Sequence, residues 1–138
     1  MEVERSDSPV VMLVEDFADT REMLRRMLEM NGCRVLEAAN GQEAIGLLPN
    51  GEFDLVLMDL NMPVLDGFTA TLRIREHERT RDVPVVAVTA HDTEEFRAAA
   101  VAVGCCEYIV KPLDFDRLSE LLDRLIPSRR RAHAAARD

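Results

Sequence analysis

The sequence predicts an α/β fold: a doubly wound, five-stranded parallel sheet of the (βα)5 type. Three observations predict it. Four short apolar runs, rich in β-branched residues, each finish in a polar group, which is typical of strands that a parallel sheet buries on both faces. Segments with a helical spacing of apolar residues lie between these runs. Strand and helix alternate five times, which predicts right-handed crossovers that place helices on both faces of the sheet.

The expected strands follow one another at regular intervals along the chain. In order they are Val10–Val14, the weaker run Cys33–Ala38, Leu55–Met58, Val85–Val88 and Tyr108–Val110. Helical spacing is clearest in three groups: Met23, Leu24, Met27 and Leu28; Phe96, Ala99, Ala100 and Val103; Leu118, Leu121, Leu122 and Leu125. These groups predict helices before the second strand, before the fifth strand and at the end of the domain.

Turn and capping residues mark where the helices begin and end. Asn31-Gly32 and Gly104 are typical of helix C-termini, and Thr93 and Asp114 are typical of N-caps. Asn40-Gly41 and Asn50-Gly51 bound a short helix, and Asp66-Gly67 indicates a turn and the start of another one. Each boundary agrees with the neighbouring apolar pattern, which supports the alternation of strands and helices.

Length and charge limit what the chain can do. Its 138 residues suffice for one domain, which we expect at 9–126, between a flexible leader (1–8) and a basic, Ala-rich tail (127–138) that leaves no room for an output domain. The net charge of −9 argues against nucleic-acid binding.

No apolar run approaches the roughly 18 residues of a membrane span. The acidic N-terminus lacks the features of a secretory signal, so we expect a cytoplasmic protein.

The three cysteines predict no metal site. Cys33, Cys105 and Cys106 are odd in number and lack the spacing of zinc ligands. In a cytoplasmic protein we expect free, buried thiols.

Lys111 is the only lysine among 17 basic residues. It follows an apolar run and precedes Pro112, which places its ammonium at the end of a predicted strand, where open α/β folds bind ligands. An ammonium acts as a point charge toward a phosphate or a carboxylate, whereas arginine presents a planar fork. Lys111 is therefore a candidate site residue.

Polar residues end the other strands too. Because parallel strands end at the same edge of the sheet, Glu15, Asp16, Asp59, Thr89 and Lys111 are expected to lie together there. Three close carboxylates repel one another unless a hard cation neutralises them. Magnesium suits an all-oxygen site better than zinc does.

Among these carboxylates, Asp59 is the candidate that reacts. It ends what is expected to be the central strand, where its side chain is held rigidly, whereas Glu15 and Asp16 enter a loop and are better placed to hold a metal. A carboxylate can act as a nucleophile toward a phosphoryl group and form an aspartyl phosphate. Since phosphoryl transfer needs mainly positioning and charge neutralisation, a metal, an ammonium and a hydroxyl suffice.

With these motifs in place, the chain resembles the receiver domains of two-component response regulators, and the chemotaxis-type single-domain regulators among them. The resemblance covers about residues 9–126. Its motifs are Glu15-Asp16 in Leu-Val-Glu-Asp, Asp59 in Leu-Met-Asp-Leu-Asn-Met-Pro-Val-Leu-Asp-Gly, Thr89-Ala90, and Tyr108 three residues before Lys111-Pro112. It implies a flavodoxin-like sheet with strand order 2-1-3-4-5.

The resemblance also implies a role for each site residue. Asp16 would bind Mg²⁺ directly, Glu15 through water, Asp59 as both ligand and phosphoacceptor, and Asn61 through its main-chain carbonyl. Mn²⁺ could replace Mg²⁺.

The phosphoryl group and the switch involve a second set of residues. Thr89 and Lys111 would contact the phosphoryl oxygens, and Lys111 would pair with the Asp59 carboxylate before phosphorylation. Lys111-Pro112 would be a cis peptide, and Thr89 and Tyr108 would form a two-state switch.

The implied partners are proteins. A sensor histidine kinase or a histidine phosphotransfer protein would donate the phosphoryl group, and a downstream protein would receive the signal. The chain would catalyse only its own phosphorylation and dephosphorylation, so it would not be a turnover enzyme. A homodimer is possible through the leucines of the last helix.

Three other interpretations account for parts of the sequence. A receiver module cut from a hybrid histidine kinase is the main alternative to a single-domain regulator. A magnesium-dependent aspartyl-phosphate hydrolase of the haloacid dehalogenase type normally has a second aspartate two positions after its nucleophile, where this chain has Asn61. A flavodoxin-like cofactor binder would have a glycine-rich turn after the first strand, and Glu15-Asp16 stands there instead.

Overall fold

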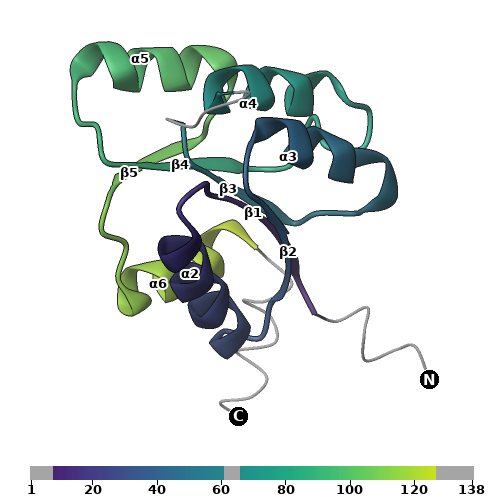
Figure 1. Cartoon of the computed structure of the whole chain (residues 1–138), viewed down its shortest axis with the longest axis vertical. Coiled ribbons are helices and arrows are strands. Elements are labelled where there is room, and N and C mark those ends of the chain that lie inside the picture. The colour runs from purple at the N-terminus through teal and green to yellow at the C-terminus, as the bar shows by residue number, and fades with distance from the viewer. Residues whose placement is uncertain (1–7, 61–65, 127–138) are drawn as a thin grey trace.

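The structure is a computed structural model that describes residues 8–60 and 66–126. A five-stranded parallel sheet has the order β2-β1-β3-β4-β5 (Figure 1). Its strands are β1 (Val10–Val14), β2 (Arg34–Ala38), β3 (Leu55–Met58), β4 (Val85–Thr89) and β5 (Glu107–Val110). The helices are α2 (Ala18–Met30), α3 (Gly41–Leu47), α4 (Gly67–Glu76), α5 (Glu94–Val103) and α6 (Phe115–Leu125), with a short 3-10 helix at Leu48–Asn50. The predicted fold class and strand order are confirmed.

Helices cover both faces of the sheet. Helices α3, α4 and α5 lie on one face, and α2 and α6 lie on the other (Figure 1). Alternate strand residues enter two separate apolar clusters: Met12 and Val14 pack under the first set of helices, and Val11 and Leu13 under the second. This two-sided burial explains why the central strands read as unbroken apolar runs in the sequence.

The helix boundaries agree with the capping residues of the sequence. Asn40, Asp66, Thr93 and Asp114 each accept a hydrogen bond from the backbone N–H three residues ahead, at the start of α3, α4, α5 and α6. Gly104 ends α5 in the left-handed region, with a φ of 111°. Helix α2 differs, because its N-cap is Phe17 and makes no side-chain cap.

Two expectations need adjustment. The strand edges shift by a residue in places, since β4 includes Thr89 and β5 begins at Glu107. The three cysteines form no disulfide, as expected, but only Cys33 and Cys105 are buried, and Cys106 is exposed. Cys105 follows the turn at the end of α5 and belongs to the apolar cluster, whereas Cys106 lies in the bend before β5 and is exposed.

The leucines of α6 are used inside the domain. Leu118, Leu121 and Leu122 are buried against the sheet, and Leu125 packs at the edge of the same cluster. Within the described residues the longest helix has 13 residues, and none has the length and apolar character of a membrane span. The predicted leader and tail lie almost wholly outside the described residues, and the domain boundaries stay a prediction.

Candidate functional site

The polar residues that follow the strands meet at one edge of the sheet, as the sequence predicts. Glu15 and Asp16 follow β1, Asp59 follows β3, and Lys111 follows β5. The strand hydrogen bonding continues into the site, since the backbone N–H of Asp59 donates to Val14 O and that of Glu15 donates to Ala38 O, each at 3.0 Å. The backbone under these carboxylates is therefore fixed by the sheet.

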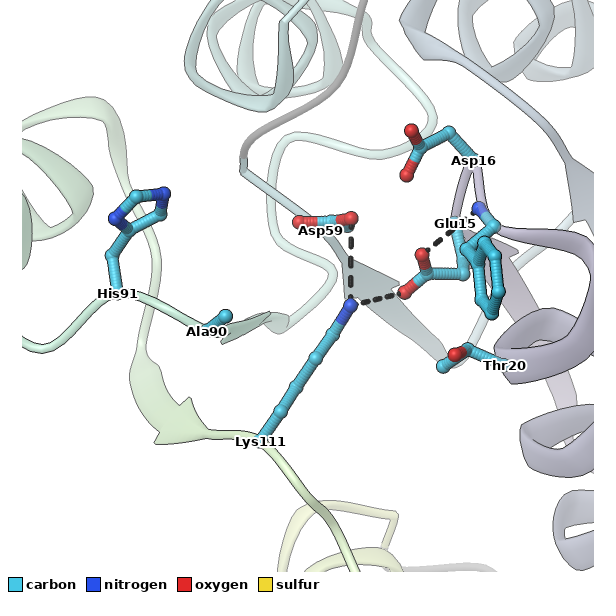
Figure 2. Close-up of a pocket in the computed structure, with 8 residues that line it drawn as sticks. Glu15, Asp16, Thr20, Asp59, Ala90, His91 and Lys111 are labelled. Carbon is cyan, nitrogen blue, oxygen red and sulfur yellow. Dashed lines mark hydrogen bonds and ion pairs between the residues drawn. The ribbon is translucent and has the colours of Figure 1, made fainter.

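An open pocket of about 250 Å³ lies over this edge. Figure 2 shows eight residues that line it, namely Glu15, Asp16, Phe17, Thr20, Asp59, Ala90, His91 and Lys111. The sequence motifs do not predict Phe17 or Thr20 as site residues. The available signal was their position: both lie just after the acidic pair, where α2 begins.

Three carboxylates are close enough to share a metal ion. One oxygen from each of Glu15, Asp16 and Asp59 lies within 4.8 Å of the others. Glu15 and Asp59 are 2% and 6% exposed, whereas Asp16 is exposed. Carboxylate oxygens are the ligands that hard divalent cations prefer, and one accessible ligand leaves the cluster open for an ion to enter.

Lys111 balances part of this negative charge. Its Nζ lies 2.7 Å from Glu15 Oε1 and 3.6 Å from Asp59 Oδ2 (Figure 2). Burial lowers the pKa of Lys111, but the hydrogen bond to Glu15 and the charge of Asp59 outweigh it, so the pKa lies above its ordinary value. The ammonium is held between Glu15 and Asp59, with the shorter contact to Glu15.

Thr89 and Tyr108 are linked through the backbone of a single residue. Thr89 is fully buried, and its hydroxyl oxygen accepts a hydrogen bond from the His91 N–H at 3.3 Å. The Tyr108 hydroxyl donates to the His91 carbonyl oxygen at 2.6 Å. A movement of the Thr89 hydroxyl would therefore act on the same peptide segment that the Tyr108 hydroxyl binds.

Gly67 allows the start of α4 to approach Asp59. A Cβ at position 67 would lie 2.4 Å from the Asp59 carbonyl oxygen and 2.5 Å from Leu60 Cα. The Gly67 N–H donates to Leu60 O at 3.2 Å, and the Asp66 side chain caps the helix by accepting from the Thr69 N–H. The prediction that a helix starts at Asp66-Gly67 is confirmed.

Two other sequence expectations concern this edge of the sheet. The Lys111-Pro112 peptide bond is cis, as expected. Asn61, the expected carbonyl ligand, lies outside the described residues.

Residues 11–123 match the response regulator receiver domain family. The chain belongs to this family. The match extends from the second residue of β1 into α6, so it contains β2 to β5 in full and every residue that lines the pocket.

Relatives of this receiver domain include short and long proteins. Protein PilH of Pseudomonas aeruginosa is 33% identical over 84% of this chain and 96% of its own length. The sensor histidine kinase CheAY of Helicobacter pylori is 34% identical over 85% of this chain, which corresponds to 15% of the kinase. The chain is thus similar to a nearly whole small protein and to a small part of a large one.

A solved structure with the same fold contains a metal ion. The receiver domain of a sensor histidine kinase from Pseudomonas aeruginosa has 34% identity and a TM-score of 0.81, with 87% of this chain and 98% of that chain covered. That structure has a magnesium ion coordinated in its active-site cleft. In this receiver domain, the acidic cluster of Glu15, Asp16 and Asp59 could bind a metal ion.

Proposed function

We propose that this receiver domain accepts a phosphoryl group on Asp59 from a phosphohistidine of a sensor kinase or a phosphotransfer protein. The observation that carries the proposal is the position of Asp59: the residue is 6% exposed, its N–H donates to Val14 O, and its Oδ2 lies 3.6 Å from the Lys111 Nζ. In the transfer, a carboxylate oxygen would bond to phosphorus while the phosphorus–nitrogen bond breaks. The electron pair of that bond goes to the donor imidazole, which then takes up a proton.

The donor set fits Mg²⁺, and Mn²⁺ could replace it. We assign Asp16 and Asp59 as direct ligands, Glu15 as a ligand through water, and the Asn61 carbonyl as a further ligand. When bound, the ion would neutralise negative charge between the carboxylates and the phosphoryl oxygens. Because Glu15 is already bonded to Lys111, its part in the site includes holding that ammonium.

The remaining residues would bind the phosphoryl group and change conformation in response to it. Lys111 can offer its ammonium to a phosphoryl oxygen as a point charge. The Thr89 hydroxyl would turn from the His91 N–H to another phosphoryl oxygen, and the loss of that hydrogen bond would free the His91 segment. Because Tyr108 binds the His91 carbonyl, this gives a Thr89/Tyr108 switch with a physical connection.

The partners and setting follow from the proposed chemistry. Besides the phosphoryl donor, we propose a downstream protein target and no nucleic-acid partner, in accord with the net charge of −9. Homodimerisation and a cytoplasmic location stay predictions. The family is a signalling domain rather than an enzyme with external substrates, so we propose that it catalyses only its own phosphorylation and dephosphorylation.

We also propose that the chain works as a single-domain regulator. The similarity to PilH over 96% of that protein supports this assignment. The similarity to a 15% segment of a kinase favours the alternative, in which the domain serves a hybrid histidine kinase.

Chemical phosphorylation tests the central assignment. Incubation with Mg²⁺ and acetyl phosphate should add one acid-stable, base-labile phosphoryl group, measured by intact mass. Asp59→Asn and magnesium-free samples should remain unlabelled. Asp82→Asn is a matched control that should label like wild type. Asp82 is an exposed carboxylate that precedes the N-terminal end of β4, at the edge of the sheet opposite the site. Equal labelling of Asp59→Asn and wild type would refute the assignment.

A further inference from the structure

Arg97, in the first turns of α5, makes two kinds of contact with its surroundings. Its Nε and Nη2 both donate to one carboxylate oxygen of Asp92, at 2.9 and 2.7 Å. Its guanidinium carbon also lies 4.6 Å from the centroid of the Tyr108 ring. Arg97 and Asp92 are both exposed, so neither contact is needed to fill the core.

The ring and the hydroxyl of Tyr108 both contact one short segment of the chain. The ring faces Arg97 and meets Phe96 edge to face at 6.4 Å, and the hydroxyl binds the His91 carbonyl. Phe96 is itself stacked on the His91 ring, with centroids 4.7 Å apart. Tyr108 therefore belongs to the same packed group as the segment 91–97, which begins two residues after Thr89.

The geometry suits arginine more than any other residue. A guanidinium over an aromatic face is attracted by the ring quadrupole. Its flat, delocalised shape lets it stack on a ring and donate hydrogen bonds in its own plane at the same time, which an ammonium cannot do in this way. The two hydrogen bonds to Asp92 already restrict the Arg97 side chain to one orientation. Less side-chain entropy is therefore lost when Arg97 stacks on the Tyr108 ring.

We propose that Arg97, held in place by Asp92, is a positioning residue that clamps Tyr108 in the conformer whose hydroxyl binds the His91 carbonyl. The clamp sets how readily Tyr108 leaves that conformer. Its part in signalling rests on the proposed Thr89/Tyr108 switch, but the clamp exists in the unphosphorylated protein and can be measured there.

The composition of the chain supplies a direct probe. Tyr108 is the only tyrosine and there is no tryptophan, so the intrinsic tyrosine fluorescence reports on this ring alone. A cation–π contact at an exposed site changes the ratio of two populations, molecules with Tyr108 clamped and molecules with Tyr108 released, by about two- to fivefold. We expect Arg97→Ala to raise the acrylamide quenching constant by up to about twofold, Asp92→Asn to raise it less, and Arg97→Lys to give an intermediate value.

Arg26→Ala is the matched control. Arg26 is an exposed helical arginine that pairs with Glu22 at 2.7 Å, the same distance as the Arg97–Asp92 pair. Its removal should leave tyrosine quenching unchanged. The clamp is refuted if Arg97→Ala and Asp92→Asn both quench like wild type, or if Arg26→Ala raises quenching as much as Arg97→Ala does.

Titration of the Tyr108 phenol distinguishes loss of the clamp from a general loosening of the segment 91–97. Burial raises the pKa of Tyr108, the charge of Arg97 lowers it and the charge of Asp92 raises it. Arg97→Ala should therefore raise the pKa of Tyr108 and Asp92→Asn should lower it, although both increase quenching. General loosening of the loop would move the pKa in the same direction in both variants, and that result would contradict the clamp.

A final comparison distinguishes failure of the clamp from failure of the proposed function. Tyrosine quenching is measured before and after labelling with Mg²⁺ and acetyl phosphate, in wild type and Arg97→Ala. The ratio of the two quenching constants should differ between the proteins by up to about twofold. Equal ratios in labelled proteins would overturn the regulatory role of Arg97. Absence of labelling would instead refute the proposed function, and the quenching difference before labelling would still establish the clamp.

Discussion

At the scale of single residues, Gly67 is where the site depends on the absence of a side chain. A Cβ would lie 2.4 Å from the Asp59 carbonyl oxygen, so Gly67→Ala must push α4 away from the strand end that is followed by Asp59, the proposed acceptor. We expect a loss of about 1–3 kcal/mol in the free energy of unfolding, the usual cost of overpacking, and slower labelling of Asp59. Denaturant unfolding and the rate of labelling measure the two effects.

Gly46 provides the matched control for that substitution. It lies in α3, is exposed, and leaves open space where a Cβ would stand, with no atom of another part of the chain within 4 Å. Gly46→Ala should raise the free energy of unfolding by about 0.5–1 kcal/mol, because alanine loses less backbone entropy than glycine in a helix. The changes in the free energy of unfolding are therefore expected to have opposite signs at the two glycines. A Gly67→Ala protein as stable as Gly46→Ala would contradict the steric role of Gly67.

Single residues also show what the sequence predicts well. Four site residues each follow a predicted strand: Glu15, Asp16, Asp59 and Lys111. This position predicts that they lie close together, because parallel strands end at the same edge of the sheet. The pairing within that group is less predictable: Lys111 is expected to pair with Asp59, and its shorter contact is to Glu15. A difference of about 1 Å depends on side-chain packing, which strand periodicity does not describe.

At the scale of elements, α2 is a helix with a poor N-cap. Phe17 occupies that position, makes no side-chain cap, and is 60% exposed in the pocket wall. Phe17→Ser should raise the free energy of unfolding by about 0.5–1 kcal/mol, because the hydroxyl can accept a hydrogen bond from the first turn while little buried surface is lost. Denaturant unfolding measures the gain.

Thr93→Ala is the corresponding change at a helix with a good cap. Thr93 accepts from the Phe96 N–H at 3.1 Å, so its loss should lower the free energy of unfolding by about 1 kcal/mol. Should Phe17→Ser prove less stable than wild type, Phe17 would be packing against the fold rather than leaving α2 uncapped.

The elements themselves are largely predictable. Apolar runs and capping residues locate each strand and four helix starts, because burial on both faces and hydrogen-bonded caps leave local signals. The contact of Arg97 with Tyr108 leaves no such signal: the residues are 11 positions apart, and most of α5 lies between them. Such contacts depend on how α5 packs beside β5, which is a property of the tertiary structure.

At the scale of the whole molecule, the fold holds three carboxylates together against their repulsion. The sheet fixes the backbone of Glu15 and Asp59, and burial of both side chains removes part of their hydration. Lys111 supplies one positive charge to the cluster. The apolar clusters on the two faces of the sheet therefore stabilise a site that, by itself, favours unfolding.

Magnesium should stabilise the folded protein for this reason. A ligand that binds only the folded state adds RT ln(1 + [L]/Kd), about 2.7 kcal/mol at a hundredfold excess over Kd. Adding Mg²⁺ should raise the denaturant midpoint of wild type, compared with sodium chloride at equal ionic strength, and chelation should reverse the gain. Asp16→Asn removes the exposed carboxylate of the acidic cluster, which we propose as a direct ligand. The variant should therefore lose most of this response and, without Mg²⁺, be at least as stable as wild type because one repulsive charge is gone. Asp82→Asn should respond like wild type. An equal response of Asp16→Asn and wild type would place the ion outside the acidic cluster.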